Sequence, residues 1–395
     1  MAIVAAGVGY RVWANRCQAE FDAAIAEIRA RGEPVWFSEL ESKDHPEWDE
    51  AGRRLEEVLS RLQPLSEEFD RAFSGVGPPE PENYSALATA LVENRDVVDQ
   101  VVDLARTAEC RHAYDYGTQD PLTLNLDHAT VIRAIAKLLA AEHKQRLAAR
   151  DEATAFNILT GSLEITDLLA HDPIFVVQLV RLSVGSRALN SLEHHLDKFS
   201  LDDDQVRKLD DLLDRLEASY RLTYSMLGDR AAALTSLYSV VQRRARTWRD
   251  QSGPDMAFYA RQMGTFIPLV DDTGPRSRRE VHRIAELTDT KINAQKLRLT
   301  AIVFPNLKSI HSAGIGYRQR LINARLALRV CRHRAVQGSL PTSLAVVVDE
   351  ALPAVPLGYF SGAPVRYDVE EDGFSIYDED PLEPGEDRGL FAVAY

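Results

Sequence analysis

The chain has 395 residues, enough for two or three domains and a substantial buried core. With 45% hydrophobic and 27% charged residues, its composition is that of a globular protein rather than a disordered one. The formal net charge of −14 argues against general nucleic-acid binding, which needs positive potential to meet phosphates, so no nucleic-acid partner is expected.

The cysteine content and the hydrophobic pattern set two further limits. Cys17, Cys110 and Cys331 are odd in number and widely spaced, unlike a disulfide framework or a zinc-binding pattern. No run of about 18 apolar residues occurs, so the sequence predicts no complete transmembrane helix.

Residues 1–31 are predicted to form an N-terminal helix. Apolar residues recur there at the three- to four-residue spacing of an amphipathic helix, at Phe21, Ala24, Ile25 and Ile28. The small apolar residues 2–10 leave two interpretations open. They are either the first turns of a soluble helix or the remnant of a membrane anchor, too short by itself to span a bilayer.

Residues 32–312 are predicted to form the main helical domain. Apolar stripes recur at helical spacing, most regularly at Ile174, Val177, Val180, Val184, Ala188 and Leu192. Short loops between successive helices favour antiparallel neighbours, in a multi-helix bundle or an irregular helical array. No fixed repeat period is found, and the tetratricopeptide signature is missing.

An irregular polar and aromatic loop, residues 110–128, interrupts this domain. It holds side chains suited to proton transfer: His112, Tyr114, Asp115, Tyr116, Asp127 and His128. Acid–base chemistry needs such groups to converge in a pocket, and nothing in the spacing forces them together. The loop is therefore either a hydrogen-bonded connection between helices or the site of an enzyme. A shared pocket with shifted pKa values would favour the enzyme.

A second histidine-containing group, Glu193-His194-His195, lies near a predicted helix end. Adjacent residues on a helix point about 100° apart, so the two histidines are expected at the surface rather than on one metal ion. The sequence contains no HExxH, GxSxG, P-loop or GxGxxG motif in its proper context.

Residues 313–395 are predicted to form a small α+β module with an acidic tail. Its long helix, 317–337, has an apolar seam and an arginine-rich face, which is expected to be solvated or to bind an anionic partner. A short helix is expected at 341–352, starting at Pro341. Alternating apolar residues on either side of Asp372-Gly373 predict a β-hairpin, and Phe391 and Val393 are candidates for a third strand.

The order of glycine, proline, leucine and aromatic positions in 324–377 resembles the periplasmic part of type II secretion pseudopilins. The matching residues are Gly338, Pro341, Leu344, Leu352, Pro353, Pro356, Gly362, Pro364, Tyr367, Gly373, Phe374 and Tyr377. Most of the chain resembles a group of uncharacterised bacterial helical proteins tethered to the membrane, through Gly32-Glu33-Pro34 and Gln178–Arg181. The resemblance implies a cell-envelope location, at the inner membrane and facing the periplasm. A cytoplasmic location is the alternative, and no activity is implied.

Pseudopilins often carry a calcium-holding loop after the last strand of this pattern, where this chain has an acidic tail. Its candidate ligands are Asp378, Asp380, Glu383 and Asp387. Carboxylate oxygens suit calcium, although the spacing is not that of an EF-hand. The tail is thus either solvated or a calcium site, and no other cofactor is expected.

Together these features predict a mainly α protein with a small C-terminal helix-plus-hairpin module. The first functional hypothesis is a non-enzymatic cell-envelope protein that binds a protein partner or associates with itself. The candidate contact residues are Tyr359, Phe360, Tyr367, Phe374, Tyr377, Arg325, Arg329 and Arg332. The alternatives are an enzyme that uses the 110–128 loop in an inter-helix pocket, and a helical bundle that binds a small ligand.

Overall fold

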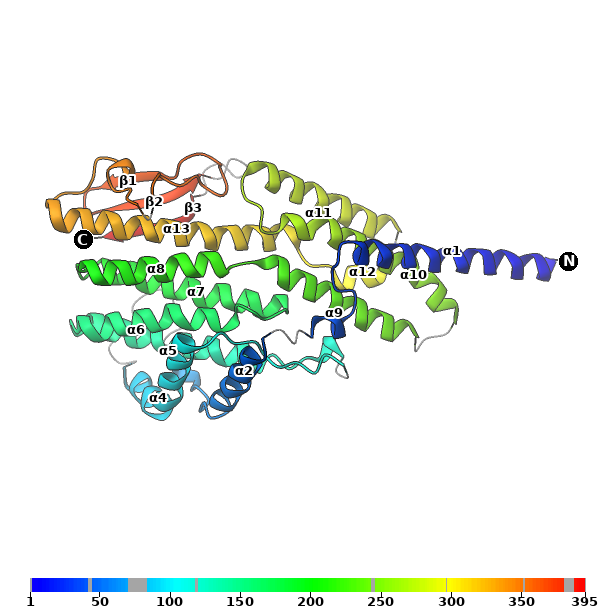
Figure 1. The fold of residues 1–395 in the computed structure, drawn as a ribbon, viewed down its shortest axis with the longest axis horizontal. Coiled ribbons are helices and arrows are strands. Elements are labelled where there is room, and N and C mark those ends of the chain that lie inside the picture. Colours follow the sequence, from blue (N-terminus) through cyan, green and yellow to red (C-terminus); the bar gives the residue numbers. More distant parts are fainter. Residues whose placement is uncertain are drawn as a thin grey trace.

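A computed structural model describes residues 2–41, 45–69, 84–117, 120–242, 246–295, 297–350, 352–379 and 387–394. The described chain is mainly helical, with a small antiparallel sheet near its C-terminal end (Figure 1), which confirms the predicted fold class. The first helices are α1 (Ala2–Ala30), α2 (Pro46–Leu59), α4 (Tyr84–Thr107), α5 (Asp127–Ala148), α6 (Glu152–Glu164) and α7 (Phe175–Leu196). They are followed by α8 (Asp203–Ser219), α9 (Leu222–Gln242), α10 (Arg246–Phe266), α11 (Pro275–Gln295), α12 (Arg298–Val303) and α13 (Leu307–Gln337).

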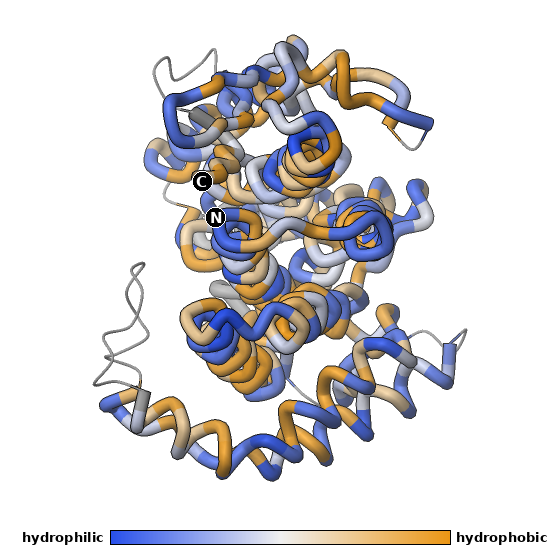
Figure 2. The backbone as a smooth tube through the Cα atoms, turned by 90° about the vertical axis from the view of Figure 1, so that its left-hand side faces the viewer, coloured by the Kyte–Doolittle hydropathy of each residue, from blue (hydrophilic) through white to orange (hydrophobic). Residues whose placement is uncertain are grey.

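The long helices α6, α7, α8 and α13 lie side by side with nearly parallel axes (Figure 1). The helices α4 and α5 pack on one side of this row, with α2 against both of them, and the sheet packs on α13 at the other side. Seen along the long helices, hydrophobic and hydrophilic stretches follow one another within the turns of single helices (Figure 2). This alternation is typical of helices that bury one face and expose the other.

The buried hydrophobic residues form two clusters that meet at α7. Leu182 and Leu189 belong to the cluster shared with α1, α8, α9, α10, α13 and the sheet. Val177 and Val184 belong to the cluster shared with α2, α4 and α5. Opposite faces of α7 are therefore buried in different cores. The regular apolar stripe of its sequence marks one helix between two cores rather than a surface helix.

The helix α1 packs on α10 through its C-terminal half, where Phe21, Ala24 and Ile28 are buried. Its N-terminal turns project beyond the rest of the molecule (Figure 1). None of the described helices is both long enough and apolar enough to cross a membrane.

The C-terminal sheet contains β1 (Arg366–Glu370), β2 (Gly373–Glu379) and β3 (Asp387–Ala394), in that order. The hairpin at Asp372-Gly373 and a third strand over Phe391 and Val393 occur as predicted. Phe391 and Val393 of β3 are buried and β3 contacts α13, so the sheet is backed by that helix. The predicted boundary between residues 312 and 313 falls inside α13.

The short helix predicted at 341–352 is wrong. Only a single 3-10 turn, η6 (Leu344–Val346), forms there. Consecutive valines at 346–348 lose side-chain freedom in a helix, which weakens the helical preference of this segment. Asp349 then accepts a hydrogen bond from the backbone nitrogen of Leu352 at 2.9 Å, which closes a turn instead.

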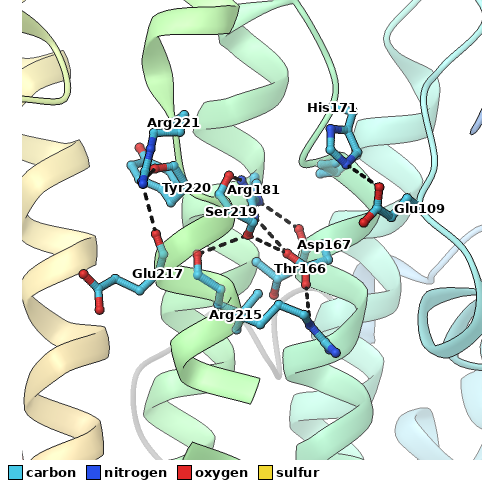
Figure 3. Close-up of polar contacts among 12 residues, drawn as sticks. Glu109, Thr166, Asp167, His171, Arg181, Arg215, Glu217, Ser219, Tyr220 and Arg221 are labelled. Carbon is cyan, nitrogen blue, oxygen red and sulfur yellow. Dashed lines mark hydrogen bonds and ion pairs between the residues drawn. The ribbon is translucent and has the colours of Figure 1, made fainter. Parts of the chain in front are cut away.

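A buried arginine fixes the chain just before α7. Arg181 of α7 is 1% exposed, and its Nη2 donates to Asp167 Oδ1 at 2.9 Å and to Ser219 Oγ at 2.6 Å (Figure 3). Asp167 belongs to the 3-10 turn η4 (Ile165–Leu169). Gln178 donates from Nε2 to the carbonyl oxygen of Asp172 at 3.0 Å. These bonds anchor the link between η4 and α7, where Asp172 lies.

Candidate active site

A cavity of about 570 Å³ lies between α2, the 110–128 loop and the N-terminal end of α5. His112, Asp127 and His128 line it, so three of the residues singled out in the loop share one pocket. Glu56 of α2 lines it as well. Asp115 is not a lining residue; its Oδ1 accepts from the backbone nitrogen of Gly117 at 3.2 Å. The cavity has the size of a small-molecule site.

Close packing brings α2 to the loop that carries His112. A Cβ atom built on Gly52 would lie 2.0 Å from the carbonyl oxygen of Arg111, so only glycine permits this approach. The Arg111 guanidinium pairs with both carboxylate oxygens of Asp49, at 2.8 and 3.0 Å. Glu56, one turn after Gly52, is thereby held beside His112.

The first acid–base pair is Glu56 and His112. His112 Nδ1 lies 2.6 Å from Glu56 Oε1. Burial and the neighbouring His128 lower the pKa of His112 to about 3, so its imidazole is neutral near pH 7. Burial raises the pKa of Glu56 above its ordinary value. The proton affinities of the two groups are therefore closer together than in water.

The second pair is His128 and Asp172. His128 Nε2 lies 3.1 Å from Asp172 Oδ2, and both side chains are almost fully buried. Tyr114 donates its hydroxyl to the same oxygen at 2.8 Å, and Ile174 donates its backbone N–H to Oδ1 at 2.9 Å. Burial and Asp172 raise the pKa of Tyr114, which keeps the phenol protonated and donating.

These contacts fix the tautomer of His128. An ionised carboxylate only accepts hydrogen bonds, so Nε2 of His128 carries the hydrogen and Nδ1 carries a lone pair. That Nδ1 is buried and has no hydrogen-bond partner among the described residues. The imidazole rings of His112 and His128 stack at a centroid distance of 3.8 Å and an interplanar angle of 11°. Two stacked imidazoles, each beside its own carboxylate, can exchange protons with a bound molecule.

The aromatic and basic contact candidates of the C-terminal module lie mostly inside the protein. Phe360 and Phe374 are each 1% exposed and belong to the core. Arg325 and Arg329 are buried against Asp210 of α8, with nitrogen–oxygen distances of 2.9 and 2.7 Å. Neither arginine is solvated as expected, because the face of α13 that carries them packs on α8.

The remaining contact candidates are more accessible. Tyr367 and Tyr377 are half-buried, and Tyr377 donates its hydroxyl to Asp368 at 2.7 Å. The Tyr359 hydroxyl donates to Glu217, and Arg318 lies 4.7 Å above the Tyr359 ring. Arg332 is exposed and pairs with Asp203 at 2.8 Å.

The candidate calcium ligands are described only in part. Asp378 is buried, and its Oδ2 accepts from the backbone nitrogens of Phe360 and Ser361 at 2.6 and 3.2 Å. Asp380, Glu383 and the side chain of Asp387 lie outside the described residues. Among the residues that the structure describes, no group of three or more His, Cys, Asp or Glu side chains could hold a metal ion. The calcium site therefore stays a prediction.

Neither histidine of the Glu193-His194-His195 group is exposed at the surface as expected. His194 is half-buried and His195 is fully buried. His195 Nδ1 lies 3.3 Å from Nε2 of His143 on α5. The helix rotation of about 100° per residue, which argued against a shared metal, also turns His195 into the core.

Sequence reasoning missed both Glu56 and Asp172 as site residues. Glu56 lies on the polar face of an amphipathic helix, where charged residues are ordinary, so nothing in the sequence singled it out. Comparisons of the chain with protein-family models, curated proteins and solved structures give no match.

Proposed function

We propose that the protein is an enzyme that performs general acid–base chemistry on a small molecule bound in the cavity beside α2 and α5. The observation that carries the proposal is the stacked pair His112 and His128, each with its own carboxylate, Glu56 or Asp172. Pairs of titratable groups with opposite pKa shifts are typical of acid–base sites.

His128 is the proposed base. Asp172 holds its Nε2 hydrogen, so Nδ1 can take a proton from the substrate, and the resulting imidazolium is stabilised by the same carboxylate. Tyr114 and the backbone nitrogen of Ile174 orient Asp172. They act through Asp172 and are positioning groups.

Glu56 and His112 are the proposed acid couple. Glu56 accepts a hydrogen bond from His112 Nδ1–H across the 2.6 Å contact. His112 Nε2 takes a proton from solvent and passes it to the substrate, and the Glu56 carboxylate stabilises the imidazolium formed in between. One proton leaves the substrate and one enters it, so the exchange balances. Solvent then takes the proton from His128.

The test compares turnover of a panel of small esters, amides and amines by the intact protein and its variants. His128→Asn and Glu56→Gln should each lower turnover by about 10²- to 10⁴-fold, the usual contribution of a positioned acid or base. His333→Gln is the matched control, because this half-buried histidine on α13 lies in neither acid–base pair. Equal turnover in the wild type and all variants would overturn the proposal.

A second candidate is the non-enzymatic cell-envelope protein with a protein partner. Two observations favour it: the N-terminal turns of α1 project beyond the rest of the molecule (Figure 1), and Val12 and Trp13 of the same helix are 64% and 39% exposed. The pseudopilin-like pattern of 324–377 supports the envelope location. Cell fractionation and co-purification, repeated with Val12→Ser and Trp13→Ser, test it. Recovery of the wild type only as a free cytosolic monomer would exclude this candidate.

A further inference from the structure

We infer that the ligand of the cavity is a small organic cation, a primary ammonium group with a short apolar part. The inference rests on the proposed function, since it names the substrate class of the same site. It is drawn from the charge, the hydrogen-bonding capacity and the apolar wall of the described lining.

The charged lining residues are acidic. Glu56 and Asp127 line the cavity, and no lysine or arginine does so in the part of the chain that the structure describes. Two nearby arginines, one on α2 and one just after its C-terminal end, are engaged elsewhere. Arg53 pairs with Glu50 at 2.6 Å, and Arg61 reaches Gln100 and Asp96 at 2.6 and 3.3 Å.

Neither carboxylate forms an ion pair with a lysine or arginine among the described residues. Glu56 contacts His112, which is neutral because burial and the nearby His128 hold its pKa at about 3. Asp127 stands in the first turn of α5 and forms no ion pair with the residues that the structure describes. An anionic ligand would be repelled there, while a cation would supply the missing counter-charge.

The lining also presents unused acceptors. Nδ1 of His128 is a lone-pair acceptor without a hydrogen-bond partner among the described residues, on a side chain that is 4% exposed. The carboxylates of Glu56 and Asp127 are acceptors as well. An ammonium group has N–H donors and no acceptor, so it can pair with any of these groups.

The apolar residues of the lining indicate the chemistry of the uncharged end of the ligand. Leu59, Leu62 and Val131 give the cavity an apolar wall, which suits an alkyl or aryl group. An ammonium N–H that donates to Nδ1 of His128 would be placed at the proposed base, so the inferred ligand and the proposed chemistry agree.

The test measures binding of n-butylammonium, 1-butanol and butyrate to the intact protein by calorimetry and by the ring-proton NMR signals of the histidines. Butylammonium should bind at least about tenfold more tightly than butanol, as expected for hydrogen bonds to charged groups. Butyrate should bind least, and added salt should weaken only the butylammonium complex. Glu56→Gln and Asp127→Asn should each weaken butylammonium binding by about tenfold without changing butanol binding.

Glu57→Gln is the matched control, because Glu57 is an exposed neighbour on α2 that does not line the cavity. It makes the same change of charge and should leave all three affinities unaltered. If butanol or butyrate binds as tightly as butylammonium, the cation inference is overturned while the cavity remains a ligand site. If none of the probes binds or shifts the His112 and His128 signals, the proposed function fails as well.

Discussion

His143 of α5 and His195 of α7 face each other inside the core, with Nε2 and Nδ1 3.3 Å apart and both side chains fully buried. Burial lowers the pKa of both, to about 3 for His143 and about 4 for His195, from an ordinary value of 6.5. His195, His194 and Lys144 lower the pKa of His143 further. The folded protein thus keeps both rings neutral at pH values where the unfolded chain protonates them.

This linkage predicts acid sensitivity. Between about pH 6.5 and pH 4 the unfolded state binds more protons, so the free energy of unfolding falls as the pH falls. The loss is at most about 1.4 kcal/mol per pH unit for each histidine. Urea denaturation at pH 7.5 and pH 5.0 measures it. His195→Gln should reduce the difference between the two pH values, and His333→Gln should not. An unchanged difference in His195→Gln would contradict this account.

Gly52→Ala should destabilise the protein and disturb the candidate site together. The new methyl group would meet the Arg111 carbonyl oxygen at 2.0 Å, and backbone cannot yield as a flexible side chain does. Such overpacking costs roughly 1–3 kcal/mol. Denaturant unfolding and the NMR signal of the neighbouring His112 report the two effects. Gly117→Ala is the control, since its nearest neighbour lies 3.9 Å away. Equal stabilities of the two variants would refute the close-approach argument.

The ion pairs between α8 and α13 should differ sharply in their contribution to the free energy of unfolding. Burial alone would raise the pKa of Asp210, but hydrogen bonds from Arg329 and Arg325 lower it. Asp210→Asn removes the buried partner of two guanidinium groups and leaves each of them an exposed one, Asp214 for Arg325 and Asp349 for Arg329. It should cost up to about 3–5 kcal/mol of unfolding free energy. Asp203→Asn breaks the exposed pair with Arg332 and should cost at most about 1 kcal/mol. Thermal unfolding of both variants makes the comparison, and similar losses would contradict it.

Local patterns in the sequence were enough for most of the fold. The stripe from Ile174 to Leu192 predicted α7, and Asp372-Gly373 predicted the turn between β1 and β2. The prediction of a helix at 341–352 was wrong because it gave more importance to the proline at the start than to the three valines that follow. In the structure the chain closes a turn at Asp349 instead. The spacing of apolar residues also could not show that α7 is buried on opposite faces, because this depends on which helices, distant in sequence, pack against it.

The candidate site was only half visible in the sequence. The composition of the 110–128 loop drew attention to His112 and His128. Their carboxylate partners come from other elements: Asp172 is 44 residues from His128, and Glu56 lies on α2. Arg325 looked like part of a solvated helix face for the same reason, since its partner Asp210 is 115 residues away. Convergence of distant residues is a property of the tertiary structure, and a single sequence carries no direct sign of it.

Asp378→Ala should destabilise the C-terminal module even without calcium. The buried carboxylate accepts two backbone N–H groups, from Phe360 and Ser361, and its loss leaves those donors unsatisfied at a cost of about 1–3 kcal/mol. Asp378→Asn keeps an acceptor oxygen and should cost less. Thermal unfolding with and without calcium separates this structural role from metal binding. A calcium-dependent rise in the melting temperature of the wild type, lost in Asp380→Ala with Glu383→Ala, would assign the acidic tail to calcium. Full stability of Asp378→Ala in chelator would show that the amide contacts contribute nothing.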